Sequence, residues 1–146
     1  MIRKKKMIGT LSQLHTLRER KVTDLSGQLA QQKQLVQRYH ENIESLSQLT
    51  AGEAVDVRNA VHLVNRATYK AHIQRVIDWQ NQAVVIAEKQ QETIQGELIT
   101  HACQEKTVAL MRSQQQQELA LAQAREQQKL TDAQAMQCWV RNRRMA

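Results

Sequence analysis

Apolar residues recur in the first third of the chain at alternating steps of three and four. Seven of the nine positions in this series, which runs from residue 22 to residue 50, are apolar or aromatic, and only Gln32 and Thr50 are polar. The seven are Val22, Leu25, Leu29, Val36, Tyr39, Ile43 and Leu46. Such a heptad seam is typical of a helix that packs against another helix in a coiled coil. We therefore predict a first helix over about residues 10–50, with its seam shifting toward the N-terminus to Leu11, Leu14 and Leu17.

The heptad pattern breaks at Gly52, a residue type that readily adopts the left-handed conformation found just after a helix. The pattern predicts a connector over about residues 51–66. Residues 54–66 have a mixed apolar pattern and are expected to form a short connecting helix. A second long helix is predicted over about residues 67–143.

The second half of this helix changes period. Val108, Leu119 and Leu130 recur every 11 residues, which predicts a straighter apolar stripe than a heptad gives. Because neither stripe is stable alone in water, we expect one all-α coiled-coil domain over residues 1–146, a long antiparallel two-helix hairpin with the longer helix second. About 25 residues of the second helix, near 119–143, then have no partner in the hairpin. This segment predicts a partner protein, or a second copy of the chain.

Composition supports helices and excludes most other folds. The chain has no proline, no phenylalanine and four glycines, so turn residues are scarce and a β-sandwich or a doubly wound sheet is not expected. The net charge of +7 lies at the two ends. The residues concerned are Arg3, Lys4, Lys5, Lys6, Arg141, Arg143 and Arg144. Because the body is neutral, no nucleic acid partner is expected, although a basic nucleic-acid-associated coiled coil and a structural homodimer are alternatives.

The sequence lacks the patterns that catalysis and cofactor binding require. No two of the five histidines are three or four residues apart, and the four glycines are isolated rather than grouped in a phosphate-binding loop. We therefore expect no enzyme activity, no metal site and no cofactor. The two cysteines suit a reducing cytoplasm.

Three stretches carry a resemblance to a known family. They are LHTLRERKV at 14–22, YKAHIQ at 69–74 and EQQKLTD at 126–132. Together with the length and the unequal helices, they resemble the flagellar export FliJ family, with an injectisome stalk protein of the same class as an alternative. The resemblance implies a component of the flagellar type III export apparatus. It would insert into the hexameric export ATPase ring and promote it, contact the cytoplasmic domain of the export gate, and escort export chaperones. It would be cytoplasmic, held at the inner membrane by its partners.

The resemblance also implies two sets of contact residues. The set for the ATPase ring is Leu11, Leu14, Leu17, Arg18, Leu130, Trp139, Arg141 and Arg143. The set for the export gate is Tyr39, Ile43, Leu46, Tyr69, His72, Ile73, Val76 and Trp79. Five of the gate residues also fit the coiled-coil core, and for these we favour the core: Tyr39, Ile43, Leu46, Tyr69 and Ile73. Trp79 falls off the seam, and an exposed tryptophan is a good interface anchor.

Overall fold

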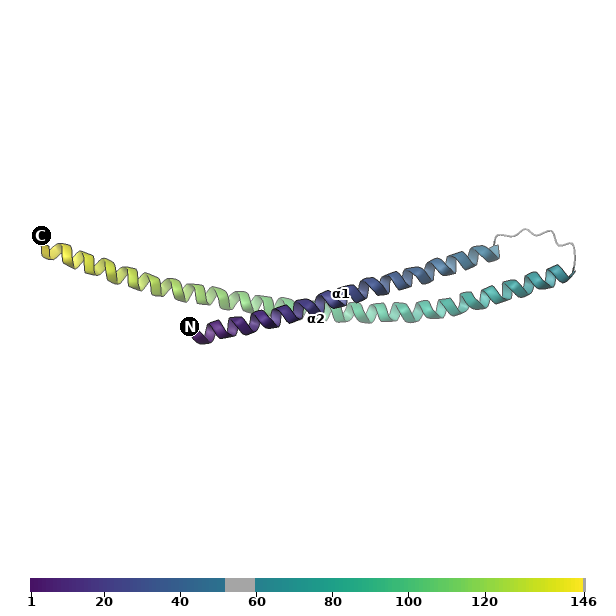
Figure 1. Cartoon of the computed structure of the whole chain (residues 1–146), viewed down its shortest axis with the longest axis horizontal. Coiled ribbons are helices and arrows are strands. Elements are labelled where there is room, and N and C mark those ends of the chain that lie inside the picture. Colours follow the sequence, from purple (N-terminus) through teal and green to yellow (C-terminus); the bar gives the residue numbers. More distant parts are fainter. Residues whose placement is uncertain (52–59, 146) are drawn as a thin grey trace. The chain divides into compact units, whose positions relative to one another are not determined.

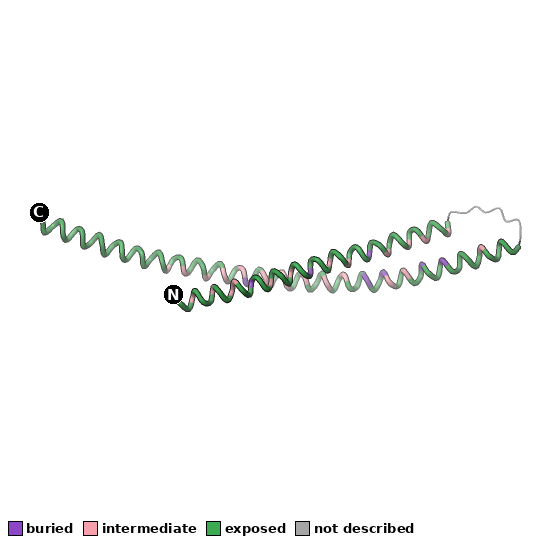
Figure 2. The backbone as a smooth tube through the Cα atoms, in the orientation of Figure 1, coloured by how far each residue is buried: buried purple, intermediate pink, exposed green. Residues whose placement is uncertain are grey.

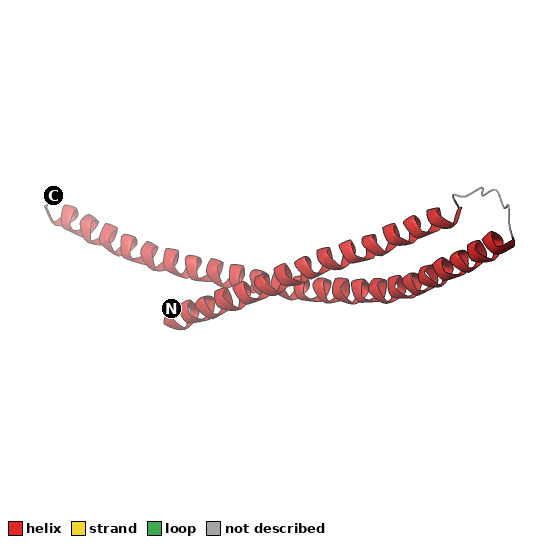
Figure 3. Cartoon of the chain, turned by 45° about the vertical axis from the view of Figure 1, so that its right-hand side comes forward, coloured by secondary structure: helices red, strands yellow, loops and turns green. Residues whose placement is uncertain are grey.

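Two long α-helices account for nearly all of the chain that the computed structural model describes, which is residues 1–51 and 60–145. Helix α1 spans Ile2–Ala51 and has 50 residues; α2 spans Ala60–Met145 and has 86. Figure 1 shows both helices, and Figure 3 shows that the described ranges contain no strand. The predicted all-α fold with a longer second helix is confirmed.

Both helices begin earlier than the pattern predicts. Helix α1 begins at Ile2 rather than near residue 10, and the amide of Lys5 already donates to the Met1 carbonyl at 3.1 Å. Helix α2 begins at Ala60 rather than near residue 67, so the last part of the expected connector belongs to it. No proline interrupts either start, and helix-forming side chains therefore extend both ends. The expected cap at Gly52 lies outside the described residues, as does the connector up to residue 59.

The chain divides into two compact units, and each contains a part of both helices. Unit 1 comprises Met1–Lys21 and His101–Ala146, and unit 2 comprises Val22–Thr100. In unit 1, Lys4 Nζ lies 3.5 Å from Glu118 Oε2, and Arg18 Nη1 donates to Gln104 Oε1 at 2.6 Å. Higher numbers on α1 meet lower numbers on α2, so the two segments run antiparallel. That the units form one domain stays a prediction.

In unit 2 the helices are again antiparallel and share an apolar core. Gln32 Nε2 donates to Gln90 Oε1 at 3.2 Å, and His40 Nε2 lies 3.3 Å from Glu88 Oε1. All nine positions of the predicted α1 seam are buried or half-buried. Figure 2 shows buried and half-buried segments recurring along α1 and α2. Leu25 is the most deeply buried, with 1% of its surface exposed. The buried residues of α2 in this unit are Ile73, Ile77, Val84 and Ala87. The predicted seam is therefore confirmed for residues 22–50.

In unit 1 the seam of α1 keeps the same heptad register. Its covered positions at heptad steps are Lys4, Ile8, Leu11, His15 and Arg18, with Ser12 half-buried beside them. The predicted shift of the seam to Leu14 and Leu17 is wrong, because both side chains are exposed, Leu17 at 59%. A helix that supercoils around one partner presents the same heptad face along its length, even where that face carries polar residues.

Helix α2 also keeps the heptad in unit 1. Its covered positions step by four and three through Val108, Arg112, Gln115, Leu119 and Ala122. The predicted 11-residue stripe is therefore wrong, and Leu130, its last member, is exposed. Val108 and Leu119 are covered, but the covered positions between them step by four and three, and Leu130 lies beyond Ala122, the last covered residue of α2.

The last part of α2 has no cover within unit 1. Every residue from 123 to 145 is exposed, whereas Leu119 and Ala122 are half-buried. The predicted unpartnered segment is thus confirmed, with its start near residue 123 instead of 119. Neither described helix holds a stretch that is apolar enough to cross a lipid bilayer.

Candidate functional site

The C-terminal segment of α2, residues 123–145, is an exposed helix with large apolar side chains. It is rich in good helix formers, and Gln128 Nε2 donates to Asp132 Oδ1 at 2.9 Å across one turn. Its large exposed apolar residues are Leu130, Met136, Trp139, Val140 and Met145. Apolar surface left in water costs about 25 cal/mol per Å² compared with the same surface covered. The segment therefore gains from any partner that covers it.

The end of the C-terminal segment combines this apolar surface with positive charge. The guanidinium carbon of Arg143 lies 5.0 Å from the centre of the Trp139 ring, a cation–π contact one turn apart. A shallow surface hollow on the same segment is lined by Met136, Gln137, Val140, Arg141, Arg144 and Met145. The segment therefore presents apolar contacts and arginine donors together, which suits a protein surface with acidic side chains.

The residues predicted to contact the ATPase ring fall into two groups. Leu11 and Arg18 lie in the seam against α2, where Arg18 is occupied by its hydrogen bond to Gln104. The other six are exposed within unit 1: Leu14, Leu17, Leu130, Trp139, Arg141 and Arg143. Of the eight, these six have exposed side chains that a partner protein can contact without any change in the packing of α1 against α2.

Half of the residues predicted to contact the export gate belong to the core of unit 2. Tyr39, Ile43 and Leu46 are half-buried on the α1 seam, and Ile73 is buried opposite on α2. These four agree with the coiled-coil core that we favoured for them. Tyr69 does not, because it is 51% exposed and lies one position off the seam. The heptad steps from Ile73 lead to residues 70 and 66, which place Tyr69 on a flank of the helix.

The other predicted gate residues form an exposed stripe on α2. Tyr69, His72, Val76 and Trp79 follow one another at steps of three, four and three, so they share one face of the helix. Trp79 is 68% exposed, as its position off the seam predicted. The stripe continues one heptad beyond Trp79 to the exposed Ile86. The sequence analysis did not include Ile86, although its spacing of seven residues from Trp79 places it on the same face. We call these five residues the unit 2 stripe.

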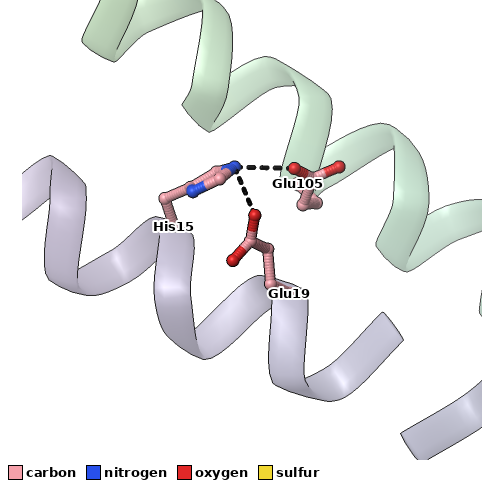
Figure 4. Close-up of side chains that lie close together, drawn as sticks. All are labelled: His15, Glu19 and Glu105. Atoms are coloured by element: carbon pink, nitrogen blue, oxygen red, sulfur yellow. Dashed lines mark hydrogen bonds and ion pairs between the residues drawn. The ribbon is translucent and has the colours of Figure 1, made fainter. Parts of the chain in front are cut away.

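A polar cluster inside unit 1 also escaped the sequence analysis. Figure 4 shows the ring of His15 on α1 directed at Glu105 of α2, with the carboxylate of Glu19 on α1 approaching the same ring nitrogen. His15 Nε2 lies 2.6 Å from Glu105 Oε1 and 3.6 Å from Glu19 Oε1. His15 is buried, with 8% of its surface exposed. No pair of histidines marks this cluster in the sequence; its local signal is a histidine and a glutamate four residues apart.

Comparison with known proteins places the chain in a family. The family model described as flagellar FliJ protein matches residues 7–144, a range that takes in both helices and both units. No curated protein and no solved structure matches the chain. The unequal helices, the heptad seam and the exposed C-terminal segment agree with the resemblance of its sequence motifs. The chain therefore belongs to the flagellar FliJ family and is a component of the flagellar protein export system.

Proposed function

We propose that this chain is a stalk for the flagellar export ATPase. Unit 1, which contains both ends of the chain, inserts into the hexameric ATPase ring and promotes its assembly and activity. The observation that carries this proposal is the C-terminal segment, whose residues are all exposed and which joins large apolar side chains to arginines. Membership of the FliJ family supports the choice of an export ATPase as the partner.

The stalk acts physically and performs no catalysis of its own. A single helix inside a six-fold ring presents different side chains to each subunit. Contacts that differ between subunits can favour different nucleotide states in them, since a ligand shifts a conformational equilibrium by its difference in affinity for the two states. The C-terminal segment supplies such asymmetry, with Trp139 and Arg143 on one face and the polar Gln134 elsewhere around the helix.

The unit 2 stripe is the proposed contact for the cytoplasmic domain of the export gate. Its support is the exposure of Trp79 and Val76 on one face of α2, away from the seam. Through this contact the chain is held at the cytoplasmic face of the inner membrane, although neither described helix could span a bilayer. Escort of export chaperones completes the proposed role, as the family suggests.

Two matched tryptophan variants test these assignments against each other. Trp139→Ala is expected to weaken binding to the ATPase ring by about thirtyfold, the loss typical of a hot-spot tryptophan, and to leave gate binding unchanged. Trp79→Ala is expected to do the reverse. Binding is measured for each purified variant with the ATPase hexamer and with the gate domain, together with ATP hydrolysis. Equal losses on both partners, or none on either, would contradict the assignment.

Removing residues 130–146 tests directly whether the exposed C-terminal segment is needed for the stalk function. The truncated chain is expected to lose stimulation of ATP hydrolysis and ring formation, which electron microscopy follows, while unit 2 keeps its binding to the gate. Gln134→Ala, on an exposed polar position of the same segment, is the control and leaves stimulation intact. Binding that weakens as salt rises indicates pairing of the arginines with acidic side chains, whereas salt-independent binding indicates the apolar contacts.

A second copy of the chain is the main competing occupant of the C-terminal segment. Light scattering distinguishes the two, since a free stalk has the chain mass of 16.9 kDa and a dimer has twice that mass. A dimer that dissociates when residues 130–146 are removed would replace the stalk proposal. A filter-binding measurement with DNA at physiological salt tests the nucleic acid alternative.

A further inference from the structure

The His15, Glu19 and Glu105 cluster brings three metal-ligand side chains together across the two helices of unit 1. Each offers one ligand atom, and the three atoms all lie within 4.8 Å of one another. His15 and Glu19 are four residues apart on α1, so they lie one above the other on the same face. Glu105 faces them from α2, as Figure 4 shows. The three ligands therefore come from positions 90 residues apart in sequence, joined by the antiparallel pairing of the unit.

His15 is a polar residue at a covered position of the helix pair. It occupies a heptad seam position, where an apolar side chain would normally be covered, and its side chain is 10% exposed. Burying an imidazole costs free energy unless its polar atoms are paired. One nitrogen is paired with Glu105 in the structure, and the carboxylate of Glu19 lies close by with 57% of its side chain exposed. The cluster is thus buried on the histidine side and open to solvent on the Glu19 side.

We propose that this cluster is a zinc site that fastens the two helices of unit 1 together. Zinc takes imidazole nitrogen at about 2.0 Å and carboxylate oxygen at about 2.1 Å in tetrahedral geometry, which sets its ligand atoms about 3.3 Å apart. The two distances from His15 Nε2, 2.6 and 3.6 Å, lie on either side of that value. Three protein ligands leave a fourth position for water on the open side. Mixed nitrogen and oxygen donors suit zinc better than calcium or magnesium, which prefer oxygen alone.

Zinc binding at this cluster replaces a proton with a metal. Zinc takes the Nε2 lone pair of neutral His15 in the tautomer that carries its proton on Nδ1. A proton on Nε2 therefore leaves to solvent from a charged ring, or is replaced by one on Nδ1 through exchange with solvent in a neutral ring. The carboxylate of Glu105 turns from hydrogen-bond acceptor to zinc ligand, and Glu19 closes the site from the same helix as His15. Because the ligands lie on α1 and α2, the metal fixes the register of the two helices in the unit that carries the C-terminal segment. This role is independent of whether the segment binds an ATPase ring.

Titration of the full chain with zinc chloride, free of affinity tags, tests the proposal. Isothermal calorimetry is expected to show one zinc ion per chain, and saturating zinc is expected to raise the melting temperature by about 5 °C. Cobalt chloride is the spectroscopic probe. A tetrahedral nitrogen and oxygen site gives visible d–d bands without the near-ultraviolet band of a thiolate ligand. That distinction matters because Cys103 is exposed only two residues from Glu105.

Three variants decide between a zinc site and a hydrogen-bonded pair. His15→Ala removes a ligand, and Glu105→Gln keeps an oxygen that accepts from His15 but removes the carboxylate; each is expected to weaken zinc binding at least about tenfold. His40→Ala is the control, because His40 and Glu88 form an exposed pair across the helices, 3.3 Å apart. It is expected to bind zinc as the parent chain does. Circular dichroism confirms that each variant remains helical.

Three results would overturn the proposal. The first is no one-to-one binding at about 100 μM zinc, a concentration well above the affinity expected of a structural site. The second is unchanged binding in Glu105→Gln, which would leave His15 and Glu105 as a hydrogen-bonded pair only. The third is loss of binding in a chain with Cys103→Ser and Cys138→Ser, which would assign the metal to the thiols.

Discussion

The two units have the same helices and the same heptad register, yet their seams differ in chemistry. Six of the seven buried apolar residues among the described positions lie in unit 2, and unit 1 has only Val108. About half of the covered positions of unit 1 carry polar side chains instead: Lys4, Ser12, His15, Arg18, His101, Glu105, Arg112 and Gln115. Apolar burial is the main source of coiled-coil stability. Unit 2 therefore holds the helix pair together, and unit 1 has little apolar burial of its own.

Polar atoms in the seam of unit 1 are also incompletely paired. Within the described residues, His101 Nδ1 and Arg112 Nε are buried without a hydrogen-bond partner, and unit 2 has one such atom, Gln80 Oε1. A buried polar atom without a partner costs about 1–3 kcal/mol. The comparison indicates that the helix pair is firmest away from the chain ends and most easily opened beside the C-terminal segment. A partner that covers that segment can reshape the neighbouring pair at low cost.

The largest expected effect comes from the core of unit 2. Leu25→Ala is expected to lower the free energy of unfolding by about 3 kcal/mol, because Leu25 is 1% exposed and its truncation leaves a cavity in the seam. Urea unfolding followed by circular dichroism measures the change. Leu14→Ala in unit 1 is the control and is expected to change stability by less than about 0.5 kcal/mol, since Leu14 is exposed. Similar losses from both would remove the difference between the units.

An intermediate effect is expected from making unit 1 resemble unit 2. The double variant His15→Leu with Glu105→Leu is expected to raise the free energy of unfolding by about 2 kcal/mol in the absence of metal. Packed apolar side chains are often more stabilising than a buried polar pair, because they lose no hydration of polar groups. The matched control, His40→Leu with Glu88→Leu, alters an exposed pair and is expected to change stability by less than about 0.5 kcal/mol. Thermal and urea unfolding of both double variants provide the comparison. Destabilisation by the first double variant would show that unit 1 depends on its polar pair.

The smallest effect is expected from two glycines, one in each unit. Gly27 in unit 2 and Gly9 in unit 1 both lie within α1, and an added Cβ meets no atom within 4 Å at either. Gly27→Ala is expected to raise the free energy of global unfolding by about 0.8 kcal/mol, because alanine has a higher helix propensity than glycine. Gly9→Ala is expected to give a smaller gain, seen mainly as slower amide hydrogen exchange near residue 9, because that end opens before the chain unfolds. Equal gains in global stability would indicate that both units unfold together.

Local sequence patterns predicted the helices and much of their exposed surface. The heptad from Val22 to Thr50 marked the α1 seam of unit 2, and the position of Trp79 off the seam predicted its exposure. The absence of proline and the supply of good helix formers predicted two long helices, although their first turns were missed. The excess length of the second helix predicted the uncovered C-terminal segment. All of these follow from periodicity and composition, which act over a few turns of one helix.

The covered face of unit 1 depended on the partner helix. Leu14 and Leu17 are apolar and were expected in the seam, but the pairing with α2 in unit 1 covers His15 and Arg18 instead. The contact between His15 and Glu105 joins residues 90 positions apart, and no local pattern records such a pairing. By itself the sequence determined that two amphipathic helices form and where the strongest apolar seam lies. Only the tertiary structure decided which polar side chains meet, because that depends on the register of one helix against the other.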